Sequence, residues 1–182
     1  ICEKKKIPHQ LAYVVRGGTD GGLIHTSLTG VPTIAIGVPT RHIHSHVGLF
    51  DTADLDACMK LVVELAKGAK CPVITYGTGS GCAWRLDDLQ VSGLTSDFAV
   101  IHQGRVLGRC RLPMPGLHNC LNGLAVIALL SHLGFAFDAI VGGVASFEGV
   151  KRRQQVRGVV RGVTVVDDFA HHPTAVRETL HA

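Results

Sequence analysis

The stretches FAVIHQGRVLGRCRL (residues 98–112) and LNGLAVIALLSHLG (residues 121–134) decide the fold that this sequence predicts. In the first stretch, two runs rich in apolar residues flank Gln103-Gly104, and a glycine-containing pair of this kind is typical of the tight turn of a β-hairpin. The second stretch is apolar nearly all round and ends at Gly134, as a buried helix does. A hairpin followed by a buried helix indicates a protein of the α/β class.

Four further elements are expected in the second half of the chain. They are a strand at residues 73–76, a helix over residues 138–145, a hairpin of residues 155–160 and 163–166 around Arg161-Gly162, and a helix from Pro173 through His181. The second hairpin again has a two-residue turn that contains glycine, and proline suits the first turn of a helix.

In the first half of the chain, strands and helices are expected to alternate. Residues 11–15 and 31–38 are apolar runs that predict strands, the second of them covered on both faces. Residues 20–28 predict a helix between these two strands. The alternation is that of an α/β protein.

The most regular helix pattern lies just before a change in organisation. Apolar residues recur at spacings of three and four after an N-cap at Asp51 or Thr52, and Gly68 stands where the C-terminal cap belongs. Residues 67–72 then form the predicted seam. We therefore expect two incomplete α/β pieces, with a mostly parallel sheet plus antiparallel hairpins.

The composition is typical of a globular protein with a packed core. The 182 residues are 46% apolar and carry a formal net charge of +4. Basic residues cluster only at Lys4–Lys6 and Lys151–Arg153. This charge is too small and too scattered to indicate a nucleic-acid partner, so small anionic substrates are the better interpretation.

Six cysteines without a Cys-x-x-Cys pair argue against disulfides and against a thiolate zinc site, so we expect reduced thiols. The sequence has no run of about eighteen apolar residues that would predict a membrane span. The basic residues Lys4–Lys6 are soon followed by Pro8 and His9 and not by the apolar core of a signal peptide. The sequence thus predicts a cytoplasmic location and no membrane partner. Because it begins with Ile1 and ends inside a predicted helix, we expect both ends to be points of excision.

A first candidate site lies before the seam. His42, His44 and His46 alternate, so in an extended segment their side chains would point the same way, and a neutral imidazole is a common metal ligand. Three polar histidines on an exposed strand are the alternative. The turn Gly17-Gly18-Thr19-Asp20 offers amides and a carboxylate that can hold a substrate terminus at the start of a helix, or it is only a turn with an N-cap.

In this order, the motifs of residues 1–69 resemble the dinuclear-metal aminopeptidases, the family of glutamyl and tetrahedral deblocking aminopeptidases. The resemblance rests on Ile7-Pro8-x-Gln10, the Gly-Gly-Thr-Asp turn, Gly30-Val31-Pro32-Thr33, and Pro39-Thr40-Arg41-His42-Ile43-His44-Ser45. It implies that His44 is a metal ligand and that four residues line the substrate pocket. These four are Gly17, Gly18, Thr19 and Asp20. Nothing is implied for His42, which stands where a tyrosine is usual.

The same resemblance implies two zinc or cobalt ions, held by a bridging aspartate, a pair of glutamates and a further histidine that residues 1–69 do not supply. A two-metal hydrolase needs several such ligands to hold its ions and activate water. Glu3 and Glu64 are the glutamates of this piece, and Glu64 belongs to the closing helix, where a solvated position is expected. We therefore expect no hydrolase turnover from this piece alone.

A second candidate site lies near the C-terminal end. Lys151-Arg152-Arg153 precedes the second hairpin, Asp167-Asp168 follow its last strand, and His171-His172-Pro173 open a helix. A guanidinium can donate two hydrogen bonds to one phosphate, and a carboxylate at a strand end can bind ribose hydroxyls. The pattern favours nucleotide binding, with a solvated charge run and a helix cap as the alternative.

Three ordered motifs in residues 72–182 resemble the Mur ligases, which join amino acids or peptides to UDP-N-acetylmuramate. They are His118-Asn119-x-x-Asn122-Gly123-Leu124-Ala125, Ser146-Phe147-Glu148-Gly149-Val150-Lys151-Arg152-Arg153, and Val166-Asp167-Asp168-Phe169-Ala170-His171-His172-Pro173-Thr174. Within that family the motif sequences are most similar to those of murein peptide ligase, and next to those of UDP-N-acetylmuramate–L-alanine ligase. The resemblance to Mur ligases implies the end of a central ATPase domain at residues 70–152 and the start of a C-terminal domain at residues 153–182. The aminopeptidase-like fragment at residues 1–69 precedes them.

This resemblance implies ATP and magnesium as cofactors and small molecules or peptides as substrates. The implied nucleotide-binding residues are His118, Asn119 and Asn122 near adenine, Arg153 at the phosphates and Asp168 at the ribose. His171 and His172 would be the catalytic pair, close to the transferred phosphoryl group or the incoming amine. Gln154 departs from the pattern, because a hydrophobic residue is usual after that arginine.

The 182 residues contain no phosphate loop with its lysine, since the glycine-rich Gly77-Thr78-Gly79-Ser80-Gly81 lacks that residue. We therefore expect feeble ATP binding and no turnover. The favoured interpretation is a fragment or fusion derived from an ATP-dependent ligase of peptidoglycan synthesis or recycling. The alternatives are a fragment of a metal-dependent aminopeptidase and a non-catalytic or engineered chimera. Exposed sheet edges and apolar faces of such pieces would favour oligomerisation.

Overall fold

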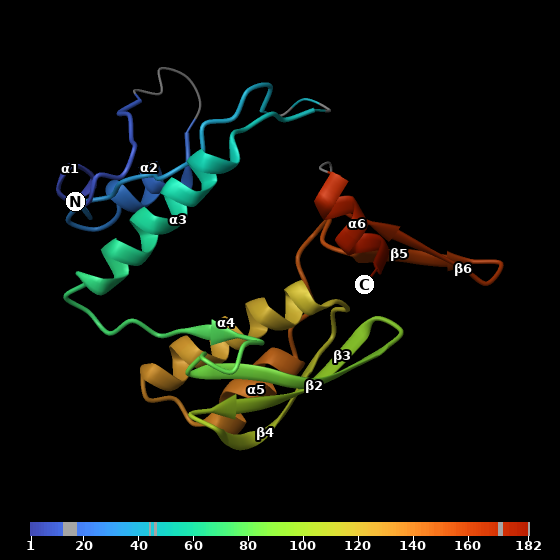
Figure 1. Cartoon of the computed structure of the whole chain (residues 1–182). Coiled ribbons are helices and arrows are strands. Elements are labelled where there is room, and N and C mark those ends of the chain that lie inside the picture. The colour runs from blue at the N-terminus through green and yellow to red at the C-terminus, as the bar shows by residue number, and fades with distance from the viewer. Residues whose placement is uncertain (13–17, 44, 46, 171–172, 182) are drawn as a thin grey trace. The chain divides into compact units, whose positions relative to one another are not determined.

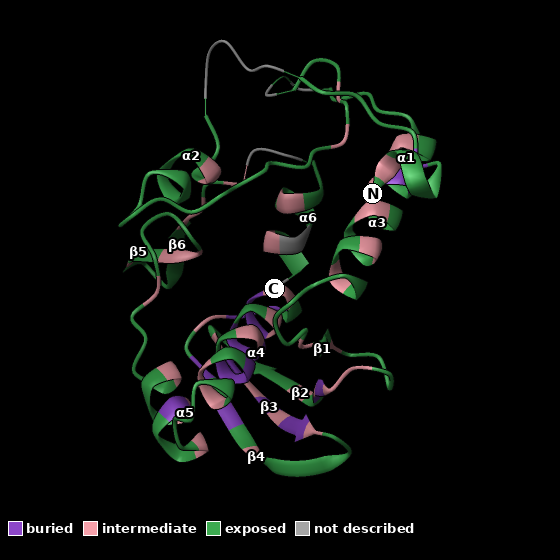
Figure 2. Cartoon of the chain, turned by 90° about the vertical axis from the view of Figure 1, so that its left-hand side faces the viewer, coloured by how far each residue is buried: buried purple, intermediate pink, exposed green. Residues whose placement is uncertain are grey.

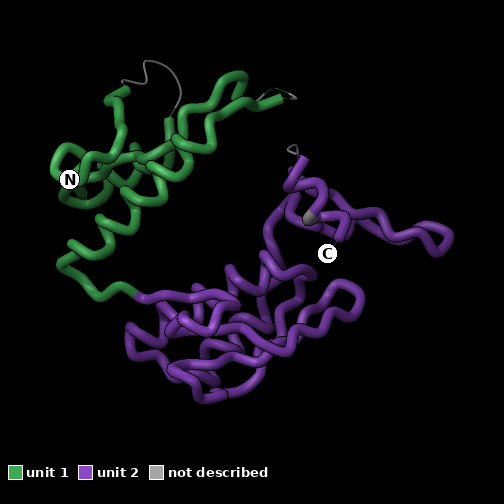
Figure 3. Tube along the Cα trace, viewed as in Figure 1, with its two compact units in different colours: residues 1–73 green, residues 74–182 purple. Residues whose placement is uncertain are grey.

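The computed structural model of the chain describes residues 1–12, 18–43, 45, 47–170 and 173–181. The chain divides into two compact units, Ile1–Val73 (unit 1) and Ile74–Ala182 (unit 2), which Figure 3 distinguishes by colour. None of the helices within the described residues is long and apolar enough to cross a membrane.

Unit 1 has three helices in its described part: α1 (Cys2–Lys5), α2 (Asp20–His25) and α3 (Thr52–Lys67) (Figure 1). Helix α3 begins and ends where the sequence predicts. The Asp51 side chain accepts a hydrogen bond from the Ala53 amide at 2.8 Å, and Gly68 follows the last turn. Helix α2 begins at Asp20 as predicted but ends earlier than expected, at His25.

The strand predicted at residues 31–38 is wrong, because the structure shows an irregular segment there. Pro32 has no N–H to donate to a partner strand. The Thr33 hydroxyl donates a hydrogen bond to the Val31 carbonyl at 2.8 Å, a local bond of the kind that competes with sheet pairing. Ile34, which was expected inside, is 75% exposed.

Pairing between extended segments is minimal in the described part of unit 1. It consists of an isolated bridge between Arg41 and Leu49. For the other strand expected in this unit, residues 13–15 lie outside the described residues and residues 11 and 12 are irregular. The α/β character of the chain is therefore carried by unit 2.

Unit 2 is built on a four-stranded sheet with the strand order β1-β2-β3-β4. The strands are β1 (Tyr76–Gly77), β2 (Trp84–Ser92), β3 (Thr95–His102) and β4 (Arg105–Leu112). Strands β1 and β2 are parallel, whereas β2 with β3 and β3 with β4 are antiparallel. The α/β class and the antiparallel hairpins are confirmed. The sheet is mixed rather than mostly parallel, because in the described part of the chain only β1 and β2 pair in parallel.

Both predicted hairpins have the two-residue turns that their sequences indicate. The φ angles are 49° at Gln103 and 80° at Gly104, and 51° at Arg161 and 79° at Gly162. Positive φ at both central residues is the requirement of the type I′ turn, whose twist matches that of the flanking strands. The second hairpin, β5 (Gln155–Val160) and β6 (Val163–Asp167), forms a sheet of its own and is followed by α6 (Pro173–His181).

Helices α4 (Leu117–His132) and α5 (Phe137–Ala145) cover one face of the four-stranded sheet. Leu86 is paired with Val100 and Phe98 with Cys110, and paired residues of antiparallel strands point to the same face. The core between this face and the two helices consists of Trp84, Leu86, Phe98, Val100, Cys110, Leu112, Cys120, Leu124, Ile127, Ala128 and Ile140. Figure 2 shows the buried residues of unit 2 concentrated on α4 and the strands beside it.

Strand β2 was not predicted, because a bulge interrupts its alternation. Leu86 faces the core, but the register shifts between Asp87 and Gln90, so Leu89 packs against the core on the far side of the shift. An Asp-Asp pair at this position hides the strand from a search for strict alternation.

The bulge in β2 is joined to β4 by a charged network. The Arg109 guanidinium donates to Asp88 Oδ2 at 2.5 Å and also pairs with Asp97 on β3. These hydrogen bonds, first that with Asp88 and then that with Asp97, raise the pKa of Arg109 above its usual value. The hydrogen bond from Arg109 likewise lowers the pKa of Asp88.

Candidate functional site

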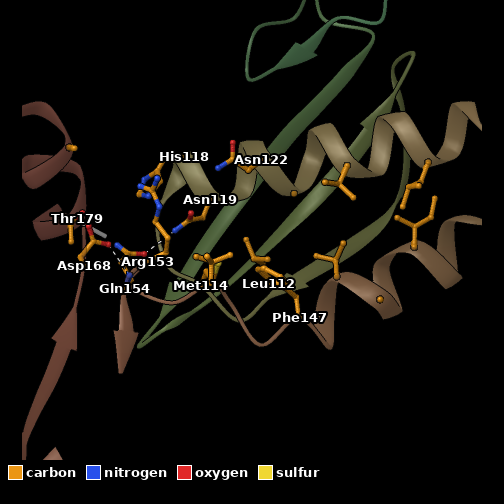
Figure 4. A pocket seen from close by; sticks show the side chains of 18 of the residues that line it. Leu112, Met114, His118, Asn119, Asn122, Phe147, Arg153, Gln154, Asp168 and Thr179 are labelled. Atoms are coloured by element: carbon orange, nitrogen blue, oxygen red, sulfur yellow. Dashed lines mark hydrogen bonds between the residues drawn. The ribbon is translucent and has the colours of Figure 1, made fainter. Parts of the chain in front are cut away.

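A pocket of about 900 Å³ lies in unit 2, between α4, α5 and the segments that follow them. Most of its wall is apolar, with Val126, Leu130, Ile140, Val144 and Phe147 among the lining residues. A polar end is formed by His118, Asn119, Asn122, Arg153 and Asp168. Figure 4 shows this polar end beside the first turn of α4. The five residues are those that the resemblance to Mur ligases implied for nucleotide binding.

Helix α4 places the first three of these residues. It begins at Leu117 rather than at the predicted residue 121, after Gly116, whose φ of 95° suits glycine. The earlier start puts His118 and Asn119 on the first turn and Asn122 on the next one. Residues three and four apart on a helix are neighbours, so these side chains share one side of α4.

Asn119 is buried, and both hydrogens of its side-chain amide have acceptors. Its Nδ2 donates to the Pro115 carbonyl at 2.7 Å and to Oε1 of Gln154 at 2.9 Å. Its Oδ1 has no hydrogen-bond donor among the described residues and remains an acceptor. Asn119 therefore joins the loop before α4 to the segment after α5.

Asp168 is half-buried and holds the end of the second hairpin in place. Its Oδ2 accepts from the Gln154 amide at 2.8 Å, and its Oδ1 accepts from the Ala170 amide at 2.7 Å. A carboxylate oxygen can accept more than one hydrogen bond, so both oxygens can still accept from a hydroxyl.

Residues 149–155, the connecting segment, carry Arg153 to the pocket. Three of these residues have left-handed backbone: Gly149 with φ 83°, Arg152 with φ 60° and Gln154 with φ 50°. The Arg152 carbonyl accepts from the Phe169 amide at 2.8 Å, and the Arg153 amide donates to the Val150 carbonyl at 3.1 Å. Such a conformation persists only where the surrounding bonds hold it.

The polar end of the pocket offers one cation and one anion. Arg153 and Asp168 are the charged side chains among the lining residues. Arg153 is exposed and makes no side-chain hydrogen bond or ion pair with the rest of the described chain. Its guanidinium is free to bind an anion. For neutral groups, Asp168 and the Asn119 side-chain oxygen can accept hydrogen bonds, and the Asn122 side-chain amide can both donate and accept them.

Several predicted site residues lie elsewhere. Gly18, Thr19 and Asp20 are exposed at the start of α2, and the N-cap residue Thr19 makes no side-chain cap bond. Gly17, His44, His171 and His172 lie outside the described residues. Within the described ranges, no three histidine, cysteine, aspartate or glutamate side chains are grouped so that they could hold a metal ion.

Gln154 also lines the pocket, although no motif in the sequence predicts a role for it. Its backbone amide bonds Asp168 and its side chain bonds Asn119, so it contacts two of the five predicted residues. The one signal in the sequence was its departure from the hydrophobic residue that the Mur pattern leads one to expect.

Comparisons with known proteins find relatives of both families that the motifs resemble. A family model described as M42 glutamyl aminopeptidase matches residues 1–61. The chain is 43% identical over 120 residues to the UDP-N-acetylmuramate–L-alanine ligase of Desulforamulus reducens, covering 65% of this chain and 26% of that protein. It is 46% identical over 107 residues to the corresponding ligase of Acidothermus cellulolyticus, covering 59% and 22%. The chain thus spans about a quarter of the length of the curated relatives it matches.

A solved structure supports the second similarity. The UDP-N-acetylmuramate–alanine ligase of Thermotoga maritima superimposes with a TM-score of 0.60 at 25% identity, covering 70% of this chain and 33% of that one. The chain therefore combines an N-terminal stretch that is similar to M42 glutamyl aminopeptidases with a longer stretch that is homologous to part of the Mur ligases.

Proposed function

We propose that unit 2 is the adenine-nucleotide half-site of a Mur-type ligase, and that the 182-residue chain binds adenine nucleotides weakly without turning them over. One observation carries this proposal. Five residues from three separate segments, which the resemblance implied for one ligand, line a single pocket: His118, Asn119, Asn122, Arg153 and Asp168.

The domain assignment belongs to the same proposal. Residues 70–152 would derive from the end of a central ATPase domain and residues 153–182 from the start of a C-terminal domain. The pocket takes its apolar wall and α4 from the first stretch and Arg153 and Asp168 from the second. A nucleotide in this pocket would therefore contact both stretches.

The polar groups at the pocket suit the parts of a nucleotide. His118, Asn122 and the acceptor oxygen of Asn119 can bond an adenine edge, and the Arg153 guanidinium can donate two hydrogen bonds to a phosphate. Asp168 can accept from ribose hydroxyls with the lone pairs that its two backbone donors leave. Magnesium would neutralise phosphate charge when bound. His171 and His172 remain proposed neighbours of the phosphoryl group or the incoming amine.

Turnover needs a further cation at the phosphates, and among the described residues that line the pocket Arg153 is the one with a permanent positive charge. The glycine-rich segment Gly77-Thr78-Gly79-Ser80-Gly81 runs from the last residue of β1 into the loop before β2, and neither it nor the rest of that loop contains a lysine. Charge neutralisation by such a lysine and by magnesium is the main source of catalysis in phosphoryl transfer. We therefore expect nucleotide binding without formation of an acyl phosphate.

Isothermal titration of the full chain with Mg-ATP tests this proposal. We expect a dissociation constant in the millimolar range and, for Arg153→Ala, a loss of about 10- to 100-fold, as for a hydrogen bond to a charged group. Arg157→Ala is the matched control, because Arg157 is an exposed arginine on β5 that does not line the pocket. Equal affinities for both variants, or no binding by the unaltered chain, would reject the half-site. Phosphate release or amide synthesis above background would reject the proposed inactivity.

The match to the M42 family favours a second proposal, for residues 1–61. We propose that this stretch derives from an aminopeptidase, with His44 as its inherited metal ligand and Gly17 to Asp20 as remnants of its substrate pocket, and that it does not hydrolyse peptides by itself. Peptide hydrolysis should be absent when zinc or cobalt is added. Hydrolysis that disappears in His44→Ala would contradict this expectation and establish a working metal site.

A further inference from the structure

The contacts of Gln154 connect three parts of unit 2 that are distant in sequence. Its side chain bonds Asn119 on α4, its backbone amide bonds Asp168 after β6, and it belongs to the connecting segment between α5 and β5. The residue next to it, Arg153, lines the pocket, and its side chain makes no hydrogen bond or ion pair with the described residues. Gln154 thus lies between α4 and the segment after β6, which both contribute residues to the polar end of the pocket.

Burial makes the bond between Asn119 and Gln154 hard to replace. Asn119 is 9% exposed, and its amide has one hydrogen on the Pro115 carbonyl and the other on Gln154. Loss of the Gln154 acceptor would leave the second hydrogen without a protein partner, and a buried donor without an acceptor carries its full desolvation penalty. The Gln154 acceptor is therefore the natural anchor of the connecting segment on α4.

The backbone of Gln154 needs such an anchor. Its φ of 50° is costly for a residue with a Cβ atom, and Arg152 nearby shares this conformation. The bond from the Gln154 amide to Asp168 holds the same position from the other side. A change in the side-chain bond would therefore alter the orientation of both Arg153 and Asp168.

We propose that Gln154 is a positioning residue, which fixes the connecting segment against the first turn of α4 through Asn119 and thereby holds Arg153 and Asp168 at the polar end of the pocket. The consequence for nucleotide affinity rests on the proposed function of unit 2. The fixation itself does not, because it concerns contacts within the free protein. A hydrophobic residue at this position would fix the segment by packing, whereas this chain uses a polar link.

Amide hydrogen exchange in the full chain without nucleotide tests the fixation. Gln154→Met keeps the length of the side chain but removes its acceptor, and we expect exchange at the amides of position 154 and Ala170 to become about tenfold faster, as the loss of one hydrogen bond predicts. Gln154→Glu keeps an acceptor for Asn119 and should keep the slow exchange. Gln155→Met is the matched control, because that side chain accepts from the Arg152 amide at 3.3 Å and not from α4. Unchanged fluorescence of Trp84 confirms that each variant is folded.

Mg-ATP titration of the same variants gives the functional arm. Gln154→Met should bind Mg-ATP about tenfold more weakly than the unaltered chain, whereas Gln155→Met should bind it with the affinity of the unaltered chain. Gln154→Glu does not serve in this titration, because its added negative charge would repel phosphate. Unchanged exchange in Gln154→Met would overturn the proposal, as would faster exchange with unaltered affinity. If exchange becomes faster but the unaltered chain binds no nucleotide, the fixation stands and the proposed function of unit 2 fails.

Discussion

Helices α3 and α4 have 16 residues each, yet α3 buries one residue and α4 buries six. Helix α3 has the better caps, with a side-chain bond at Asp51, whereas the Gly116 cap of α4 provides none. The difference lies in what each helix packs on, because α4 lies on a sheet and α3 has no sheet in the described part of unit 1. Local signals are enough to specify a helix, but burial depends on a second layer.

The same contrast extends to the two units as wholes. Among described residues, the buried apolar side chains of unit 1 are Ile7 and Ala57, while unit 2 has a continuous cluster. Helix α3 leaves an apolar stripe in water that includes Met59, Val62 and Val63. We therefore expect unit 2 to unfold cooperatively and unit 1 to be less stable and more easily opened.

Thiol reactivity gives the largest expected difference between the units. Burial, as the first cause, raises the pKa of Cys110 to about 12 from 9.0, and it also raises the pKa of Cys120. Three pKa units lower the thiolate fraction about a thousandfold at pH 8. All six cysteines are free, and Cys71 in unit 1 is exposed. Labelling with a disulfide reagent and peptide mass spectrometry should modify Cys71 first, and Cys110 and Cys120 only after unfolding. Labelling of Cys110 at the rate of Cys71 would show that the core of unit 2 is open.

Truncation of a core side chain should lower stability most among single substitutions. Leu124→Ala removes a fully buried side chain from α4 and should lower the free energy of unfolding by about 2–5 kcal/mol. Leu129→Ala on the same helix, at a side chain 56% exposed, should cost about 0.5 kcal/mol or less. Chemical denaturation followed by the fluorescence of Trp84, which belongs to the core of unit 2, measures both. Equal costs at the two positions would contradict the assigned core.

Added methyl groups probe how closely helix and sheet approach in unit 2. A Cβ at Gly108 would lie 2.9 Å from Cε1 of Phe137 on α5, so Gly108→Ala should cost about 1–3 kcal/mol. Gly142→Ala, in the interior of α5 with nothing within 4 Å, should instead stabilise by about 0.5–1 kcal/mol. Gly22 of α2 in unit 1 is equally open, so Gly22→Ala should not destabilise that helix, as circular dichroism can show. Opposite signs for Gly108 and Gly142 are the decisive result.

The elements that could be predicted from the sequence are those with local signals. Gln103-Gly104 and Arg161-Gly162 specify their hairpins through the φ angles that the turn demands, and the caps of α3 lie within two residues of its ends. The strand at residues 31–38 could not be judged in this way, because an apolar run becomes a strand only when another strand pairs with it. The bulge in β2 has the opposite effect, since it hides a real strand.

The candidate site was predictable in its parts and not in its connections. Motif resemblance implied His118, Arg153 and Asp168 as members of one site, and they line one pocket. The bond between Asn119 and Gln154 joins residues 35 positions apart, and no periodicity or motif reports such a contact. The start of α4 at Leu117 was also missed, because Gly116 acts through its backbone conformation.

The smallest expected effect concerns the ion pairs that unit 1 uses in place of a core. Glu64 on α3 pairs with Lys5 of α1 at 2.7 Å and with Lys67 at 2.8 Å. The hydrogen bond from Lys5, followed by that from Lys67, lowers the pKa of Glu64 from 4.5 to about 2. Because the folded pKa is depressed, the stabilisation is present above about pH 4.5 and is lost as the pH falls toward 2.

Thermal unfolding of the helices, followed by circular dichroism between pH 6 and pH 2, should therefore show a decrease in midpoint that is slightly smaller in Glu64→Gln, which keeps only the contribution of other carboxylates such as Asp88. Glu3→Gln, at an exposed position of α1 outside these ion pairs, should keep the decrease. Added salt should reduce the difference between the two variants, because solvent-exposed pairs are screened. An identical pH profile for Glu64→Gln and the unaltered chain would mean that α1 is not held to α3 by charge, and unit 1 would then differ from unit 2 even more than its burial indicates.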